Sequence, residues 1–211
     1  MSPGMGPIGL DFDNTIICYD SVLAELGIES GFLPAGFAGG KSAVRTAVRA
    51  LPDGEKKWQG LQAAAYGHQI GRATPFPGFG DFLARCGDRG LPLVIVSHKT
   101  RHAAADPGGV DLRAAALDWM RRHRLFDGPR SPLREDQVHF ADSRTEKVGI
   151  VRRLACRCFV DDLEEVFHDA DYPREVPALL FIGGLVTGAA PVGPWRVVSH
   201  WREVADAVIG D

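Results

Sequence analysis

Four groups of polar residues each follow an apolar segment of the chain directly. They are Asp11 with Asp13 and Thr15, Ser97 with His98 and Lys99, Asp142 with Lys147 nearby, and Asp161 with Asp162. Carboxylates that are crowded together repel one another unless something neutralises their charge. Mg²⁺ does so, because it takes oxygen ligands and keeps water positions that a substrate phosphate can replace. The paired aspartates therefore predict a magnesium site.

A lysine and a serine supply the groups that complement such a site. Lys147 brings a positive charge, and Ser97 with its neighbouring backbone amides brings hydrogen-bond donors. A carboxylate-held metal, one lysine and one hydroxyl are the groups that phosphoryl transfer requires. Lys147 is the only lysine between Lys99 and the end of the chain, which favours this role over that of a solvated helix lysine.

Each of the other residues also has a structural interpretation that stays open at this point. Asp13 could be a turn residue, and Ser97 a plain loop serine. The aspartates at 161–162 could open a helix and gain from its dipole. Asp142 is expected to cap the helix that carries Lys147.

The elements that must position these groups alternate between strand and helix from residue 74 onward. Apolar runs predict strands at 7–10, 91–96, 138–141, 157–160, 178–182 and 195–198. Amphipathic segments predict helices at 79–89, 111–124, 145–154 and 200–209. This alternation predicts an α/β domain with a parallel sheet and helices on both faces. All carboxyl ends of such strands lie at one edge, where the four polar groups would meet.

Residues 18–73 interrupt the alternation with helical spacing and no strand signal. We expect a core domain at 1–17 and 74–211 and a helical cap at 18–73, inserted over the edge where open α/β sheets bind ligands. The run Gly39-Gly40-Lys41-Ser42 is similar to a nucleotide phosphate loop, but Ala35 stands where its first glycine belongs and no strand precedes it. The run is instead a candidate substrate-facing loop. Trp58, Tyr66 and His68 are expected mainly as cap core.

Composition argues against a nucleic-acid-binding protein, a disulfide-stabilised protein and a membrane-spanning protein. Hydrophobic residues make up 45% and charged residues 24%, and the net charge of −3 gives no sign of nucleic-acid binding. The four cysteines are too sparse for a disulfide framework, and Cys156 and Cys158 suit core packing. No apolar run is long enough to span a bilayer, and Met1–Gly6 shows no signal-peptide features. We therefore expect a cytoplasmic protein without membrane contact; the sequence does not indicate its oligomeric state.

The motifs resemble those of the haloacid dehalogenase-like (HAD) hydrolase superfamily, in the right order and each at a strand end. The first motif is Asp11-Phe12-Asp13-Asn14-Thr15, and the second is Ser97 after Leu93-Val94-Ile95-Val96. The third is Lys147, and the fourth is Asp161-Asp162 after Phe159-Val160. The resemblance implies a Rossmann-like, three-layer, doubly wound sheet with a small helical cap.

The resemblance also implies a role for each residue. Asp11 would be the nucleophile, and Asp13 the general acid and then the general base. Mg²⁺ would be held by Asp11, the Asp13 carbonyl and the 161–162 pair, with Asp162 preferred as direct ligand because relatives often carry glycine at position 161. The expected phosphate-binding residues are Thr15, Ser97, His98 and Lys147. His98 and its neighbour Lys99 could face the substrate, or they could equally be a surface pair at the end of a strand.

The function implied is that of a magnesium-dependent phosphatase, which hydrolyses a small phosphorylated metabolite through an aspartyl-phosphate. Asp13 argues against a dehalogenase, because dehalogenases of this family lack that second aspartate. Two alternatives stay open. A phosphotransferase or phosphomutase would use the same residues, and a catalytically idle module of this fold would bind a partner instead.

Overall fold

The computed structural model describes residues 6–106, 109–128, 131–183 and 191–210. The chain divides into two compact units. The core unit comprises Met1–Ile17, Pro75–Lys99 and Arg121–Asp211, and the inserted unit comprises Cys18–Thr74 and Thr100–Met120. The five N-terminal residues, which entered the expectation on localisation, lie outside the described residues.

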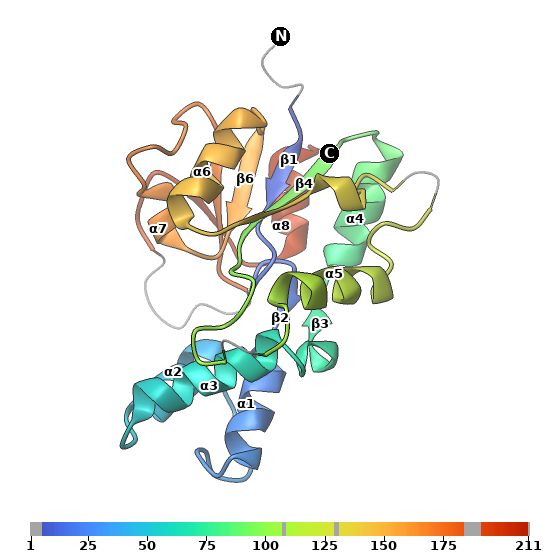
Figure 1. Cartoon of the computed structure of the whole chain (residues 1–211). Helices are drawn as coiled ribbons and strands as arrows, with labels where there is room; N and C mark the ends of the chain where they lie inside the picture. The colour runs from blue at the N-terminus through green and yellow to red at the C-terminus, as the bar shows by residue number, and fades with distance from the viewer. Residues whose placement is uncertain (1–5, 107–108, 129–130, 184–190, 211) are drawn as a thin grey trace. The chain divides into compact units, whose positions relative to one another are not determined.

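The core unit is built on a six-stranded sheet in the order β5-β4-β1-β6-β7-β8, with every neighbouring pair parallel (Figure 1). Its strands are β1 (Ile8–Leu10), β4 (Leu93–His98), β5 (Val138–Ala141), β6 (Cys158–Asp161), β7 (Ala178–Phe181) and β8 (Arg196–Val198). The strands at the centre are buried on both faces, as their continuous apolar runs require. The predicted parallel sheet is confirmed.

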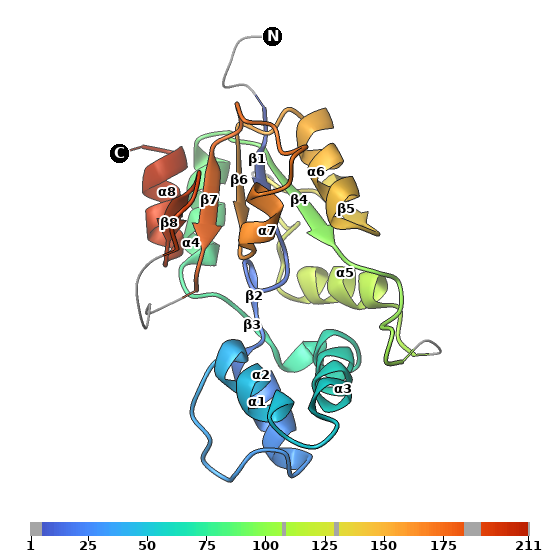
Figure 2. The same ribbon diagram turned by 90° about the vertical axis from the view of Figure 1, so that its left-hand side faces the viewer.

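Helices cover both faces of this sheet, so the core unit has three layers (Figures 1 and 2). On one face lie α4 (Phe79–Asp88) and α8 (Trp201–Val208). On the other lie α6 (Arg144–Arg153) and the short α7 (Glu164–Phe167), and a 3₁₀ turn, η2 (Glu135–Gln137), precedes β5. The Trp201 ring packs between α4 and the sheet, with its centroid 4.8 Å from those of Phe79 and Phe82 and 5.4 Å from that of Phe181. The doubly wound arrangement is thereby confirmed.

The register of the central strands brings their carboxyl ends together. Leu10 of β1 lies opposite Ile95 of β4 on one side and opposite Val160 of β6 on the other. The Asp11 amide donates to the Val160 carbonyl at 2.8 Å, which continues the ladder by one residue. The residues that follow β1, β4 and β6 therefore share one edge.

The inserted unit is helical. It contains α1 (Asp20–Glu29), α2 (Lys41–Arg49), α3 (Gly54–Tyr66), the turn η1 (Ile70–Arg72) and most of α5 (Leu112–Arg122). The Trp119 indole of α5 donates to the Ala73 carbonyl at 2.9 Å, which ties the two segments of this unit together. Two short strands, β2 (Ile17–Cys18) and β3 (Thr74–Pro75), pair where the chain passes between units. The cap boundaries at 18 and 73 stay a prediction.

The cysteines are all free thiols. Cys86, Cys156 and Cys158 are buried, and burial raises the pKa of each thiol to about 12. They contribute packing, and no thiolate chemistry is expected of them.

Among the described residues, no helix is both long and apolar enough to cross a bilayer.

Candidate active site

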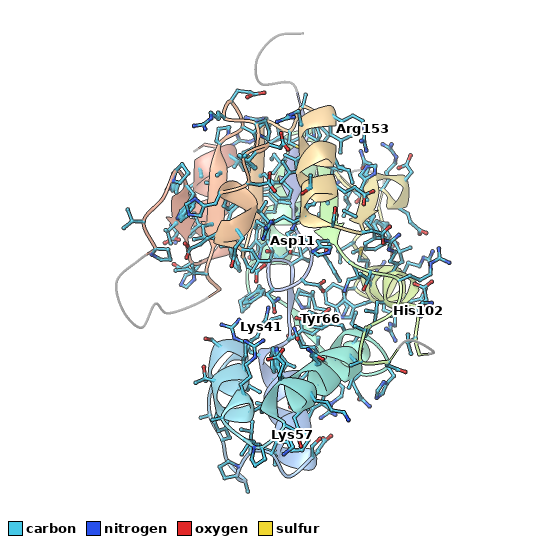
Figure 3. All side chains as sticks on the ribbon, turned by 60° about the vertical axis from the view of Figure 1, so that its left-hand side comes forward. Asp11, Lys41, Lys57, Tyr66, His102 and Arg153 are labelled. Atoms are coloured by element: carbon cyan, nitrogen blue, oxygen red, sulfur yellow. The ribbon has the colours of Figure 1, made fainter. Side chains whose placement is uncertain are left out.

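The first motif forms a tight loop directly after β1. The Phe12 carbonyl accepts hydrogen bonds from the Ile16 and Ile17 amides at 3.0 and 3.1 Å. Asn14 takes the left-handed conformation, with φ of 59°, which asparagine tolerates better than most residues. Its amide donates to the Ile17 carbonyl at 2.9 Å. The loop keeps Asp11, which Figure 3 labels, at the edge of the sheet, while Phe12 is buried.

Lys147 enters the site from the first turns of α6. The Ser143 side chain caps this helix by accepting the Glu146 amide at 3.1 Å. Glu146 reaches back and accepts the Asp142 amide at 2.7 Å. The expectation that Asp142 caps α6 is therefore wrong: Ser143, one residue later, is the N-cap, and the backbone amide of Asp142 donates to Glu146.

Two carboxylates share the Lys147 ammonium. Its Nζ lies 2.7 Å from Asp11 Oδ1 and 2.6 Å from Asp161 Oδ2. All three side chains are at most 5% exposed. Burial by itself lowers the pKa of Lys147, but the two aspartates outweigh it and hold that pKa above its ordinary value. Lys147 is thus a fixed positive charge next to the proposed nucleophile.

Asp11, Asp161 and Asp162 form an acidic cluster whose ligand atoms all lie within 4.8 Å of one another. Burial raises the pKa of Asp161 to about 7, and the nearby Asp11 adds to the rise while Lys147 opposes it. One lysine does not neutralise this many carboxylates. The donor set consists of oxygen atoms only, which fits a hard divalent cation such as Mg²⁺.

The members of the fourth motif differ in their surroundings. Asp161 is fully buried, with Oδ1 accepting the Leu163 amide at 3.0 Å and Oδ2 next to Lys147. Asp162 is half-buried. These contacts orient the Asp161 carboxylate firmly and favour Asp162 as the ligand with more access, as the resemblance implies.

Two buried hydroxyls lie in the same motifs. Thr15 Oγ1 and Ser97 Oγ have no hydrogen-bond partner among the residues that the structure describes. Thr15 and Ser97 are 0% and 1% exposed. A buried hydroxyl without a partner is costly, so both are suited to bind an oxygen of a ligand.

Lys99, two residues after the serine of the second motif, had no assigned site role in the sequence analysis. Lys99 is 3% exposed, and its Nζ lies 2.8 Å from Asp13 Oδ2. His98, expected to bind phosphate, is instead exposed. The signal was available, since side chains alternate along an extended chain, so that Ser97 and Lys99 share one side and His98 takes the other. The role of His98 stays a prediction.

The candidate substrate loop of the inserted unit already has an anionic partner. Asp20 Oδ1 accepts the Lys41 amide at the first turn of α2, at 2.6 Å. Tyr66 at the end of α3 packs against Tyr19, with ring centroids 4.4 Å apart. Trp58 is buried within this unit, as expected of a core residue.

Comparison with known proteins finds similarity at the level of the structure. Neither the protein-family models nor the curated proteins contain a match. A HAD-superfamily hydrolase of subfamily IA, variant 1, from Geobacter sulfurreducens PCA matches with a TM-score of 0.58 and 14% identity, over 98% of both chains. A HAD family hydrolase from Deinococcus radiodurans R1, with bound phosphate and sodium, matches with a TM-score of 0.51 and 14% identity, over 98% of this chain and 96% of that one.

A third solved structure is that of a candidate phosphoglycolate phosphatase from Lactobacillus delbrueckii subsp. bulgaricus. It matches with a TM-score of 0.53 and 15% identity, over 99% of this chain and 100% of that one. At such identities the likeness extends to the fold, and it does so over nearly the whole chain.

Proposed function

The chain has the fold of the haloacid dehalogenase-like superfamily hydrolases, and from that premise we propose that it is a magnesium-dependent phosphatase with Asp11 as nucleophile. The observation that carries the proposal is the Lys147 bridge between Asp11 and Asp161, beside the unpartnered hydroxyls of Thr15 and Ser97. This arrangement offers a nucleophile, a fixed cation and two free donors at one edge of the sheet.

The first step transfers the phosphoryl group to the enzyme. An Asp11 carboxylate oxygen attacks phosphorus, and the bond from phosphorus to the leaving oxygen breaks. Asp13 gives its proton to that oxygen. Lys147 holds the attacking carboxylate in place, and the hydroxyls of Thr15 and Ser97 donate to the oxygens of the transferred group.

The second step returns the enzyme to its starting state. Asp13, now a carboxylate, takes a proton from a water molecule as the water oxygen attacks phosphorus. The bond from phosphorus to Asp11 breaks, and inorganic phosphate leaves. Asp11, Asp161 and Asp162 would hold Mg²⁺, which when bound offsets the negative charge of the phosphate and of the acidic cluster.

The proposed substrate class is a small phosphorylated metabolite. Support comes from the bound phosphate of the Deinococcus structure and from the description of the Lactobacillus protein as a candidate phosphoglycolate phosphatase. Phosphorylated acids therefore come first among the substrates to test, followed by sugar phosphates and nucleoside monophosphates.

Phosphate release from a panel of such metabolites, with Mg²⁺, tests the proposal. We expect release from some members of the panel and from p-nitrophenyl phosphate. The phosphotransferase alternative would instead show transfer to an added acceptor with little free phosphate. Absence of both activities, together with no labelling of Asp11 by beryllium fluoride, would contradict the proposal.

The inserted unit is proposed to select the substrate. The chain leaves the core unit shortly after Asp13 and again directly after Lys99, so this unit is joined to the loops that carry the chemistry. We expect Lys41→Ala, Ser42→Ala and Tyr66→Phe to change kcat/KM among natural substrates more than turnover of p-nitrophenyl phosphate. The reason is that a small artificial substrate makes few contacts beyond its phosphate.

Lys57→Ala is the matched control for this series. Lys57 lies on α3 with its Nζ 5.4 Å from the centroid of the Phe32 ring of the same unit (Figure 3). It should leave substrate preference unchanged. An equal loss on every substrate for the three test variants would show that these residues support folding.

A further inference from the structure

Lys99 holds the Asp13 carboxylate by both of its oxygens. The Lys99 Nζ lies 2.8 Å from Asp13 Oδ2 and 3.1 Å from Asp13 Oδ1. The lysine side chain is 2% exposed and the aspartate side chain 15%. A cation this deeply buried is rare without a partner of opposite charge, and here the partner is the proposed acid/base residue.

The sheet fixes the lysine in turn. The Lys99 amide donates to the Ala141 carbonyl at 3.0 Å, which extends the β4–β5 ladder by one residue. The Nζ lies 5.8 Å from the centroid of the ring of Phe12, a fully buried residue of the first motif. A group held in this way by a rigid element can position another side chain precisely.

Each of the two buried lysines of the site forms ion pairs with different aspartates. Lys147 pairs with Asp11 and Asp161, whereas Lys99 pairs with Asp13. The four aspartates of the site and these two lysines leave an excess of negative charge that one divalent cation would balance. Lys99 is thus part of the charge balance of the site, and it acts at Asp13, whereas Lys147 contacts Asp11 and Asp161.

We propose that Lys99 is a positioning residue that orients the Asp13 carboxylate for its proton transfers. The inference rests on the proposed function. In the second step a bond of the attacking water to hydrogen breaks, the proton passes to an Asp13 oxygen, the water oxygen bonds to phosphorus, and the bond from phosphorus to Asp11 breaks. A carboxylate oxygen that accepts from Lys99 keeps lone pairs for that proton, while its rotation is restricted.

A double-mutant cycle on turnover tests whether Lys99 acts through Asp13. Lys99→Met should lower kcat roughly 10- to 100-fold, because small misplacement of a catalytic group has effects of that size, and it should leave KM nearly unchanged. In the Asp13→Asn background the same change should have little further effect, since the group it positions no longer transfers protons. Lys99→Arg should restore part of the loss. Lys57→Met removes an equal charge from the inserted unit and should change nothing.

The dependence of the kinetic loss on the leaving group separates a positioning role of Lys99 from a purely structural one. The loss in Lys99→Met should be smaller for phosphoenzyme formation from p-nitrophenyl phosphate, which needs little protonation, than for hydrolysis of the phosphoenzyme. Chemical-quench measurements of the phosphorylated fraction should show it rise in the variant. A uniform loss on all substrates with no rise in phosphoenzyme would overturn the inference.

Unfolding by denaturant, measured in the presence of chelator, tests the contact between Lys99 and Asp13 independently of catalysis. Denaturant midpoints of the wild type, the two single variants and the double variant should show coupling between positions 99 and 13. Denaturant midpoints without coupling between the two positions would overturn the inference. Additive losses in kcat together with a raised KM would also overturn it, and would point to direct substrate binding by Lys99. If the wild type neither hydrolyses phosphoesters nor labels at Asp11, the proposed function fails first; if it does both and the cycle is additive, only this inference fails.

Discussion

Asp11→Asn is expected to reduce turnover to background and to abolish the covalent phosphoenzyme. The amide is a poor nucleophile, and it removes one of the three carboxylates of the acidic cluster. The substitution preserves the shape of the side chain. It also leaves an oxygen that can accept from Lys147 Nζ, which in the wild type lies 2.7 Å from Asp11 Oδ1. The protein should therefore stay folded, which circular dichroism can verify. Steady-state turnover and mass spectrometry of the acid-quenched enzyme provide the readouts.

Asp13→Asn is the matched comparison, because it changes the neighbouring aspartate of the same loop. It should lower turnover by roughly 10²- to 10⁴-fold, the usual contribution of general acid–base catalysis. The loss should shrink for p-nitrophenyl phosphate, and phosphoenzyme should accumulate. Beryllium or aluminium fluoride should bind on Asp11 in the wild type. Near-normal turnover in Asp11→Asn, or an adduct on Asp13, would contradict the mechanism even with the fold unchanged.

Removal of divalent metal is expected to have an effect of similar size. EDTA should abolish activity, Mg²⁺ should restore it, and Zn²⁺ alone should not, because the cluster of Asp11, Asp161 and Asp162 offers only hard oxygen ligands. Binding to the folded state also stabilises it, by about 2.7 kcal/mol at a metal concentration 100 times the Kd. A melting experiment should therefore show a rise in Tm with Mg²⁺.

Asp162→Asn is the control for the metal prediction. It should reduce both the activity and the rise in Tm with Mg²⁺, while a variant outside the cluster, such as Lys57→Met, keeps both. Full activity of the wild type in chelator would remove the basis for a metal site at this edge of the sheet.

Much of the core unit could be predicted because strands buried on both faces have a simple signature. Continuous apolar runs ended within one or two residues of the observed ends of β1, β4 and β6, and parallel topology then placed Asp11, Ser97 and Asp161 at one edge. Local chemistry was harder to predict. Asp142 and Ser143 are both good helix caps, and only the backbone conformation at residue 143 decides between them.

Lys99 shows a different limit of sequence reasoning. Motif matching stops at Ser97 and its immediate neighbour, whereas the alternation of side chains along β4 points to Lys99. Its ion pair with Asp13 joins residues far apart in the chain, and no local pattern encodes such a pair. The same holds for residues 100–120, which group with the inserted unit through contacts such as that of Trp119 with Ala73.

The sharing of one ammonium between Asp11 and Asp161 has a consequence for the evolution of this fold. Burying ionised groups with incomplete compensation works against folding, and here it occurs beside the central strand of the sheet. Neutralising Asp11 or Asp161 would still leave Lys147 one carboxylate partner and would end the repulsion between the two, so the folded chain would form more easily while the proposed catalysis would be lost. Selection for stability alone would remove the residues on which the proposed chemistry depends.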